Sequence, residues 1–420
     1  MDQTQTKINP LSLKVNFSWT FIGNVVYAAS QWGMLALIAK IGSVHMVGQF
    51  SLALALTAPV YMFTNLQLRG VIATDAYDEY SFNDYIGLRL IMILVAIGVI
   101  ITIISFGRYE EGTTLVVLLV ALSKGVESIS DICMGLIQKH ERMDRIAISY
   151  ILKGMLSITT FGGLLFLTHQ IVIALVGLNI SWLILLMLYD LPNARRYSSL
   201  RPRFQTNSLW SLVRLSLPLG VVMMIISINV NIPRYFIMNQ LGEESLGYFA
   251  AISYIIVAGS TVVNALGQSA APRLSKYYAS GNKLKFKSLL YKLGGIGVVL
   301  GFSGFIASTL FGRQILTLLY KKEYAEYSPI FILTMISAGL GYLVSFMGYG
   351  LTAARCFKIQ PWINLVAVLV NVIGCLILIP HFGLIGAAYA SIINSLVLVF
   401  GSMAVLIYLL DLVGGHNNEC

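Results

Sequence analysis

The sequence predicts an all-α integral membrane protein with twelve transmembrane helices in two parallel six-helix lobes. Composition is the first reason: 11% of the 420 residues are charged and 57% are apolar, with a mean hydropathy of +0.80. A soluble domain usually carries about a quarter charged residues and just under half apolar ones. The composition therefore excludes a soluble fold. The lengths of the apolar runs and an internal repeat are the other two reasons.

Long apolar runs follow one another along the whole chain. A helix needs roughly 20 apolar residues to cross about 30 Å of hydrocarbon, and runs of this length satisfy their backbone groups as helices. The first run is too long for a signal-peptide core, so we expect it to be retained. The predicted spans are 15–38, 45–68, 85–106, 113–137, 147–168, 170–190, 210–238, 245–270, 288–311, 326–352, 360–379 and 383–410.

The two halves of the chain share a local pattern about 200 residues apart. Lys40-Ile41-Gly42, Gly48-Gln49-Phe50 and Asn65 recur as Gln240-Leu241-Gly242, Gly247-Tyr248-Phe249 and Asn264. Each copy falls across the turn between the first two spans of its half. Because secondary transporters are commonly built from such repeats, the duplication indicates a carrier that works by alternating access.

The predicted loops divide unevenly in charge. One set, predicted to be cytoplasmic, contains most of the loop Lys and Arg, and this bias predicts that both termini are cytoplasmic. It also explains the net charge of +10, so no nucleic-acid partner is predicted. The cytoplasmic set is Lys139, Arg142, Arg145, Arg195, Arg196, Arg201, Arg203, Arg273, Lys276, Lys283, Lys285, Lys287, Arg355 and Lys358, against Lys40, Arg108, Arg313, Lys321 and Lys322 outside.

The stretch 191–207 contains Pro192, Pro202 and four arginines and has no long apolar run. It is the predicted linker between an N-terminal lobe at 1–190 and a C-terminal lobe at 208–420. Each lobe has an even number of spans, so the second enters the membrane from the same side as the first. The repeats are therefore expected to be parallel, with the pathway between the lobes.

The fourth span contains the richest set of polar residues. They share one helical stripe, and charge at membrane depth is a candidate for function. In one interpretation Lys124 lines the pathway and the acids Glu127 and Asp131 couple transport to an ion. In the other, Lys124 pairs with Glu127 or Asp131 to hold helices together, and the residues leave this choice open. The stripe consists of Lys124, Glu127, Ser128, Asp131, Gly135 and Gln138.

Two further spans contribute polar candidates for the pathway. The seventh carries Asn231 and Arg234, and the first carries Asn24 and Gln31. Gln31 corresponds to Asn231 at the offset of the repeat, which favours a central pathway, although polar bonds between helices would also account for both. For Arg234, snorkelling toward the membrane surface is the alternative.

Three basic residues, Arg89, Lys153 and Arg214, lie near predicted cytoplasmic span ends, and snorkelling is expected for each. The run 383–388 is rich in small residues and is expected to allow close helix packing.

Catalytic and metal-binding motifs are absent from the sequence. No Gly-rich phosphate loop followed by Lys and Ser or Thr is present, the histidines are isolated, and the four cysteines lack metal or disulfide spacing. We therefore expect a transporter rather than an enzyme, without catalytic or metal-ligating residues and without a bound cofactor. Coupling to H⁺ or Na⁺ stays open.

Three stretches resemble the O-antigen flippases of Wzx type, within the multidrug/oligosaccharidyl-lipid/polysaccharide exporter superfamily. They are 48–69, 127–143 and 383–388, and the length and span number extend the resemblance to the whole chain. It implies a flippase that moves an undecaprenyl-pyrophosphate-linked oligosaccharide, the O-antigen repeat unit of lipopolysaccharide, from the cytoplasmic to the periplasmic leaflet of a bacterial inner membrane. Lys124 and Arg234 are then the candidates for contact with the anionic group. A glycan polymerase and a chain-length regulator are the partners expected from the family, besides membrane lipids.

Two alternatives remain. An ion-coupled multidrug exporter of the same superfamily typically depends on an acidic residue in the first span, where this chain has Asn24 and Gln31 and no acid. A membrane glycan polymerase usually needs a large loop outside the membrane, and the longest one predicted here is 312–325.

Overall fold

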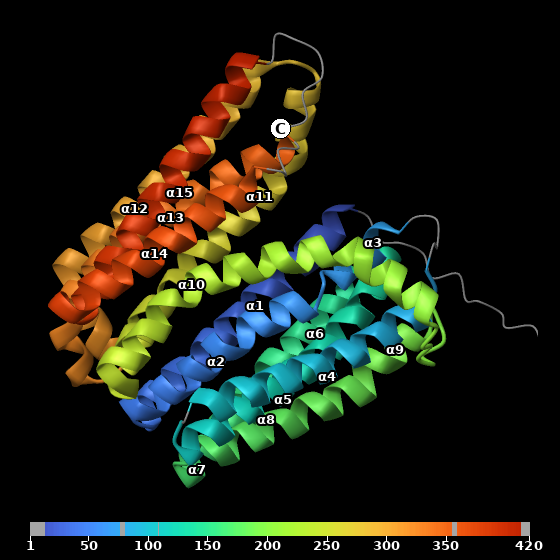
Figure 1. Ribbon diagram of the computed structural model, residues 1–420, viewed down its shortest axis with the longest axis horizontal. Coiled ribbons are helices and arrows are strands. Elements are labelled where there is room, and N and C mark those ends of the chain that lie inside the picture. The colour runs from blue at the N-terminus through green and yellow to red at the C-terminus, as the bar shows by residue number, and fades with distance from the viewer. Residues whose placement is uncertain (1–12, 76–79, 108, 355–358, 413–420) are drawn as a thin grey trace, which may run out of the picture. The chain divides into compact units, whose positions relative to one another are not determined.

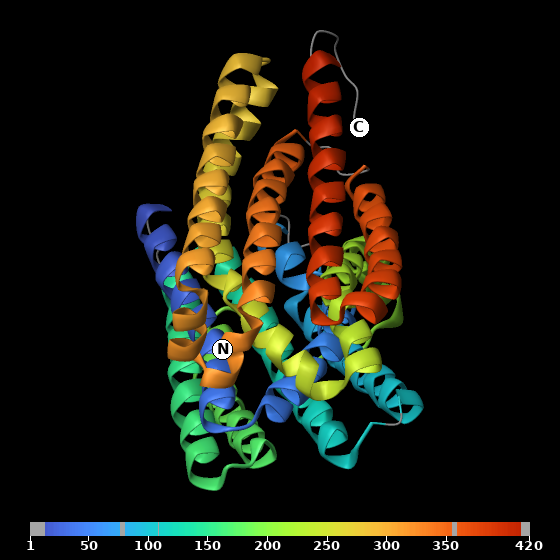
Figure 2. The same cartoon turned by 90° about the vertical axis from the view of Figure 1, so that its left-hand side faces the viewer.

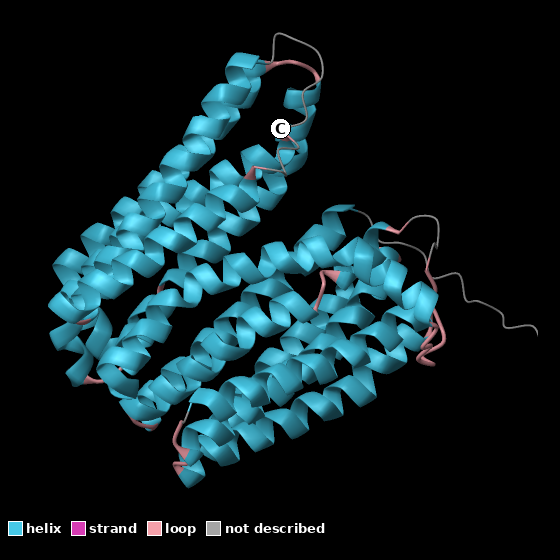
Figure 3. Cartoon of the chain, in the orientation of Figure 1, coloured by secondary structure: helices cyan, strands magenta, loops and turns pink. Residues whose placement is uncertain are grey.

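The computed structural model describes residues 13–75, 80–107, 109–354 and 359–412, which are helices joined by short turns (Figure 3). Those ranges contain no β-strand. The predicted loop cations Arg108, Arg355 and Lys358 lie outside the described residues. The all-α class predicted from the apolar runs is therefore confirmed.

The chain forms two compact units. The first contains residues 1–31 and 60–221, and the second contains residues 32–59 and 222–420. Three helices contribute residues to both units: α1 (Leu13–Ile41), α2 (Val44–Thr64) and α10 (Thr206–Tyr254). The predicted lobes at 1–190 and 208–420 stay a prediction, because compact packing does not test a sequence repeat.

In the first unit, α5 is the central helix, and α3, α4, α6, α8 and α9 all pack against it (Figure 1). A π-helical turn interrupts the predicted span 147–168, and a second π-helical turn forms the end of the predicted span 170–190. The helices of this unit are α3 (Leu68–Thr74), α4 (Phe82–Gly107), α5 (Glu111–Lys139), α6 (Met143–Leu156), η1 (Ser157–Phe161), α7 (Gly162–Thr168), α8 (Ile171–Leu185), η2 (Leu186–Asp190) and α9 (Leu191–Arg195).

In the second unit, α12, α13 and α15 lie side by side, and α14 packs on α15 (Figures 1 and 2). α12 (gold to orange) and α15 (red) are the long upright helices of Figure 2. The helices that complete this unit are α11 (Ile256–Ala279), α12 (Lys283–Leu319), η3 (Lys322–Tyr327), α13 (Ser328–Ala353), α14 (Gln360–Phe382) and α15 (Leu384–Leu412).

The surface of these helices is apolar where a soluble protein would be polar. Leu94 on α4 is 70% exposed and Val299 on α12 is 67% exposed, as lipid-facing side chains should be. Ten segments of the described chain are long and apolar enough to cross a membrane. The count of twelve stays a prediction, because it includes α5 and divides the segment 206–267 into two spans at Gly242, where φ is +83°.

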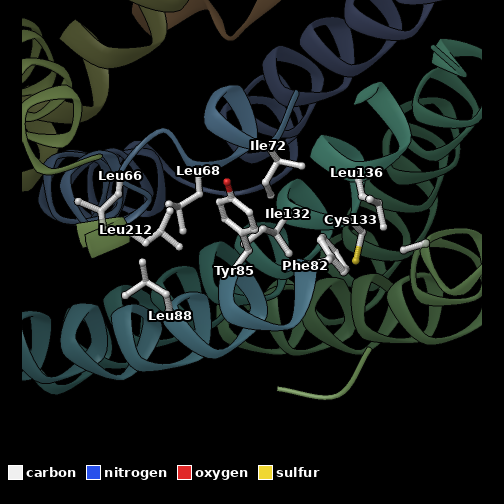
Figure 4. Packing of buried hydrophobic residues seen from close by; sticks show 11 residues of the cluster. Leu66, Leu68, Ile72, Phe82, Tyr85, Leu88, Ile132, Cys133, Leu136 and Leu212 are labelled. Carbon is white, nitrogen blue, oxygen red and sulfur yellow. The ribbon is translucent and has the colours of Figure 1, made fainter. Parts of the chain in front are cut away.

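A buried apolar cluster holds α3 and α4 against α5 (Figure 4). Several of its members are sequence neighbours of charged residues: Leu68 precedes Arg69, and Leu88 precedes Arg89. Apolar packing therefore fixes the helices that carry those charges. The cluster consists of Leu66, Leu68, Ile72, Phe82, Tyr85, Leu88, Ile132, Cys133, Leu136, Ala194 and Leu212.

A sharp break separates α2 from α3 inside the predicted span 45–68. Leu66 and Gln67 both adopt left-handed backbone conformations, with φ of 50° and 51°. A left-handed conformation costs an ordinary residue roughly 1–2 kcal/mol, and here the side chain of Leu66 is fully buried. The break redirects the chain so that α3 packs on α5.

The predicted linker 191–207 is packed against the first unit rather than extended. Its first residues form α9, and the Arg203 amide donates to the Asn83 carbonyl oxygen at 3.0 Å. A Cβ added to Gly87 would lie 2.1 Å from the Arg203 carbonyl oxygen, so glycine is required for this contact. The linker thus covers the beginning of α4.

Two glycines of the sequence repeat make reciprocal contacts within the second unit. A Cβ on Gly48 would lie 1.9 Å from the carbonyl oxygen of Glu243, and one on Gly247 would lie 2.2 Å from that of Val44. Gly48 corresponds to Gly247 in the repeat, and Val44 corresponds to Glu243. Such an exchange of equivalent contacts is what a local two-fold axis produces.

The small residues of the run 383–388 allow the close approach that the sequence predicts. A Cβ on Gly386 would lie 2.1 Å from the carbonyl oxygen of Leu378. The backbones of α14 and α15 therefore nearly touch next to the turn that joins them.

Candidate functional site

The polar stripe of α5 is built as the helical spacing predicts. Its polar members contact α1, α3, α4 and Asn65, which follows the end of α2, in the first unit. The helix positions these side chains because the spacing of three and four residues returns to the same face. The result is a network of charged and polar contacts inside an otherwise apolar unit.

At one end of this network of contacts, Lys124 pairs with Glu127. The Lys124 Nζ lies 2.8 Å from the Glu127 Oε2, and the Tyr27 hydroxyl donates to the Glu127 Oε1 at 2.6 Å. The two charged side chains are 28% and 26% exposed. The pairing interpretation of Lys124 is therefore realised in the structure, and its contact with a substrate stays a prediction.

Asp131 is shared by two arginines. Arg69 Nη1 lies 3.3 Å from one carboxylate oxygen of Asp131, and Arg89 Nη2 lies 3.6 Å from the other. Arg89 also donates to the side-chain oxygen of Asn65, which accepts a second hydrogen bond from Ser128 at 2.8 Å. The two arginines differ in accessibility, because the Arg89 side chain is 1% exposed and that of Arg69 is 25% exposed.

Arg69 is further oriented by two polar partners. It donates to the Gln138 side-chain oxygen at 3.0 Å and to the Tyr150 hydroxyl at 2.7 Å. The Tyr150 ring stacks on the ring of Tyr27, with 5.0 Å between centroids. Because Tyr27 also binds Glu127, these aromatic rings connect the Arg69 group with the Lys124 pair. A Cβ on Gly135 would lie 3.1 Å from the Arg69 Cα, so the small residue of the stripe lets α3 approach α5.

A third ion pair lies deep in the same unit. Lys153 Nζ is 3.5 Å from the Asp190 Oδ2, and these side chains are 1% and 3% exposed. The Ser130 hydroxyl donates to the same carboxylate oxygen at 2.6 Å. The prediction that Arg89 and Lys153 snorkel to the membrane surface is therefore wrong. Both face inward because a carboxylate from another helix is available there.

Fixed cations outnumber carboxylates by one in these three groups. The cations are Arg69, Arg89, Lys124 and Lys153, and the carboxylates are Glu127, Asp131 and Asp190. An uncompensated charge in a low-dielectric interior is costly. The group formed by Arg69, Arg89 and Asp131 is the one with the excess, and its partly exposed member, Arg69, is where an anion would relieve it.

The two predicted candidates of the first span do not join these contacts. Asn24 is exposed and has no side-chain hydrogen bond among the described residues. Gln31 is half-buried, and its Nε2 has no hydrogen-bond partner within the described chain. Their role in a pathway stays a prediction.

The second unit contains a cavity of about 400 Å³ beside α10. Arg234 lines it, donates to the Asn231 side-chain oxygen at 3.0 Å, and stacks over the Tyr254 ring at 5.7 Å. Asn231 is 4% exposed and also donates to the Ser227 carbonyl oxygen. No carboxylate lines the cavity, whose wall comprises Val230, Pro233, Arg234, Phe249, Ser253, Tyr254, Ile256, Val257, Ser260, Thr334, Ser337, Ala388 and Ser391.

Sequence reasoning missed Arg69, Tyr150 and Asp190 as members of the charged groups. Arg69 lies at the predicted end of a span, where a basic residue is ordinary, and no spacing rule pairs it with Asp131. Asp190 likewise falls at a predicted span end. Among the described residues, no group of His, Cys, Asp and Glu is arranged to hold a metal ion.

A family model described as "Polysaccharide biosynthesis protein" matches residues 13–278. The chain belongs to this polysaccharide biosynthesis family. A relative from Staphylococcus aureus, "Capsular polysaccharide biosynthesis protein CapF", is 31% identical over 387 residues, which cover 91% of this chain and 96% of that protein. The predicted resemblance is thus confirmed at the level of polysaccharide biosynthesis, and the O-antigen subtype stays a prediction.

Solved structures share the fold of this family member. "Lipid II flippase MurJ, inward closed conformation" superposes with a TM-score of 0.74 at 14% identity, covering 95% of this chain and 90% of that one. An inward-facing multidrug resistance MATE family transporter of the MOP superfamily gives a TM-score of 0.60 at 14% identity, covering 97% and 98%. At these identities the likeness concerns the fold, which is that of membrane transporters.

Proposed function

We propose that this member of the polysaccharide biosynthesis family is a flippase for a lipid-linked oligosaccharide. Its substrate is an undecaprenyl-pyrophosphate-linked repeat unit, moved by alternating access from the cytoplasmic to the periplasmic leaflet of a bacterial inner membrane. The O-antigen repeat unit is the substrate expected from the sequence, and a capsular repeat unit would present the same lipid pyrophosphate. Family membership and the shared transporter fold support this proposal.

The excess of fixed cations in the first unit is the observation that carries the proposal. Arg69 and Arg89 share the single carboxylate of Asp131, and Arg69 keeps part of its surface accessible. A guanidinium has five N–H donors in a planar fork that matches phosphate oxygens. An entering pyrophosphate would supply the missing negative charge, while the polyprenyl chain remains in lipid.

The cavity at Arg234 offers complementary chemistry in the second unit. Its lining combines one cation, one tyrosine ring and the hydroxyls of serine and threonine side chains. The hydroxyls of Thr334, Ser337 and Ser391 donate to backbone carbonyl oxygens, so their oxygens remain as acceptors for sugar hydroxyls. An apolar ring face suits a sugar ring. We assign Arg234 and Asn231 to the substrate pathway on these grounds, with Lys124, Gln31 and Asn24 as the candidates in the first unit.

An ion-coupled multidrug exporter is the alternative function, and the membrane carboxylates decide between the two. A coupling cation needs a carboxylate that is free to bind it, and Glu127, Asp131 and Asp190 each contact a fixed Lys or Arg. Internal cations thus occupy the positions that H⁺ or Na⁺ would take at Glu127 or Asp131. This arrangement favours the flippase over the exporter.

Replacement of Arg69 by glutamine is expected to lower transport at least about tenfold at equal membrane abundance. The reason is that a charge-assisted hydrogen bond contributes roughly 1.5–3 kcal/mol, and about 1.4 kcal/mol corresponds to a factor of ten. Transport is measured as restoration of surface glycan in cells that lack the gene. Lys124→Ala, Asp131→Ala and Arg234→Ala are compared in the same assay.

Arg196→Gln is the matched control, because Arg196 is exposed at the end of α9 in the same unit and is expected to leave transport unchanged. Arg69→Lys separates charge from geometry and should retain only part of the activity. Normal transport by a stably folded Arg69→Gln protein would contradict the proposal that the excess positive charge at Arg69 binds the pyrophosphate.

A further inference from the structure

A basic cleft lies at the end of α12 in the second unit, and no function discussed so far uses it. It has a volume of about 630 Å³ and is lined by Lys40, Arg313, Gln314, Thr317 and Leu318. We propose that this cleft binds the phosphate of a membrane-lipid headgroup.

The cleft has donors for an anion, and no carboxylate of the described chain lines it. The Arg313 side chain makes no hydrogen bond or ion pair with any described residue. Lys40 Nζ donates to the Leu318 carbonyl oxygen at 3.2 Å, which holds the ammonium at the cleft and leaves its other protons available. The Gln314 amide adds a neutral donor, whereas the Thr317 hydroxyl donates to the Arg313 carbonyl oxygen at 2.8 Å. This set matches a phosphate group.

The position of the cleft along α12 places it at headgroup depth. α12 has 37 residues and is therefore about 55 Å long at 1.5 Å per residue, longer than the roughly 30 Å hydrocarbon core. Arg313 lies within the last two turns before the helix ends at Leu319. A guanidinium at such a depth extends toward lipid phosphates.

Apolar side chains around the cleft identify the ligand as a lipid rather than free phosphate. Leu310 is 62% exposed, Phe311 is 56% exposed, and Leu318, in the cleft itself, is 73% exposed. These side chains offer acyl chains a surface on the turns of α12 next to Arg313. A lipid can use the cations and this lipid-facing surface together, whereas a free anion would use only the cations.

The charge distribution of the whole chain gives an independent reason. The predicted orientation places this end of α12 outside the cytoplasm, where Lys and Arg are rare in this sequence. The positive-inside rule therefore does not account for Lys40 and Arg313. Binding of an anionic headgroup would explain why Lys40 and Arg313 line the same cleft.

The test measures binding of phosphatidylglycerol to the purified, delipidated full-length protein. We expect an apparent dissociation constant about fivefold higher in Arg313→Gln and again about fivefold higher when Lys40→Gln is added. Lys322→Gln is the matched control, since Lys322 is exposed at the neighbouring turn outside the cleft, and it should bind as wild type does.

Inorganic phosphate at the same concentration is expected to have no measurable effect on thermal stability, whereas phosphatidylglycerol raises it. Equal stabilisation by inorganic phosphate would overturn the lipid assignment in favour of a free-anion site. Unchanged phosphatidylglycerol binding in the double variant would overturn the proposal that this cleft is the binding site. Neither result depends on transport, so the proposed flippase function is tested separately.

Discussion

Lys153→Met is expected to destabilise the protein by about 3–5 kcal/mol, because it leaves the Asp190 carboxylate buried without its cation. The two side chains are 1% and 3% exposed and lie 3.5 Å apart. Among the described residues, the Ser130 hydroxyl would then be the one hydrogen-bond donor left to that carboxylate oxygen. The measurement is thermal unfolding of the purified protein in detergent.

A double-mutant cycle distinguishes this explanation from a simple loss of packing. Lys153→Met combined with Asp190→Asn should recover most of the lost stability, since no charge is left unpaired. Lys124→Met is the comparison, because the Lys124–Glu127 pair is 28% and 26% exposed and its loss should cost clearly less. Equal losses in the two single variants, without recovery in the double variant, would contradict the buried-pair interpretation.

Gly247→Ala is expected to destabilise the second unit by about 1–3 kcal/mol or more. The added Cβ would lie 2.2 Å from the Val44 carbonyl oxygen, and a backbone atom cannot move aside as a flexible side chain can. Gly48→Ala, the equivalent change in the repeat, should behave in the same way against Glu243. The measurement is the unfolding temperature of each variant.

Gly295→Ala is the matched control for these glycines. It lies within α12 of the same unit, and a Cβ there meets no atom within 4 Å. Alanine is favoured over glycine in a helix by roughly 1 kcal/mol, so this variant should be neutral or slightly more stable. A Gly247→Ala protein as stable as Gly295→Ala would contradict the close contact between α2 and α10 at Val44 and Gly247.

Much of the fold follows from the sequence because lipid imposes simple rules. Apolar runs of sufficient length predict helices, and observed helices cover each predicted span within a few residues at most ends. The break at Leu66 and Gln67 was not predictable, since neither residue type favours a left-handed backbone. Packing of the buried Leu66 side chain decides that conformation. The π-turns 157–161 and 186–190 are equally invisible to apolar periodicity.

The sequence predicted only the part of the candidate site that lies within one helix. Lys124, Glu127 and Asp131 share a stripe because one helix carries them all. The partners Arg69, Arg89 and Tyr150 come from three other helices, and no spacing within the sequence expresses those contacts. Lys153 shows the consequence: judged by its place near a span end it should snorkel, whereas Asp190 holds it inside.

The flippase assignment is tested most directly by following lipid-linked repeat units by leaflet in cells that lack the gene. We predict that the units accumulate on the cytoplasmic leaflet and that the wild-type protein restores their transfer and the surface glycan. Arg69→Gln is expected to restore both at least about tenfold less well. If deletion leaves the leaflet distribution unchanged and instead raises drug sensitivity, the protein is an exporter and the flippase assignment is wrong.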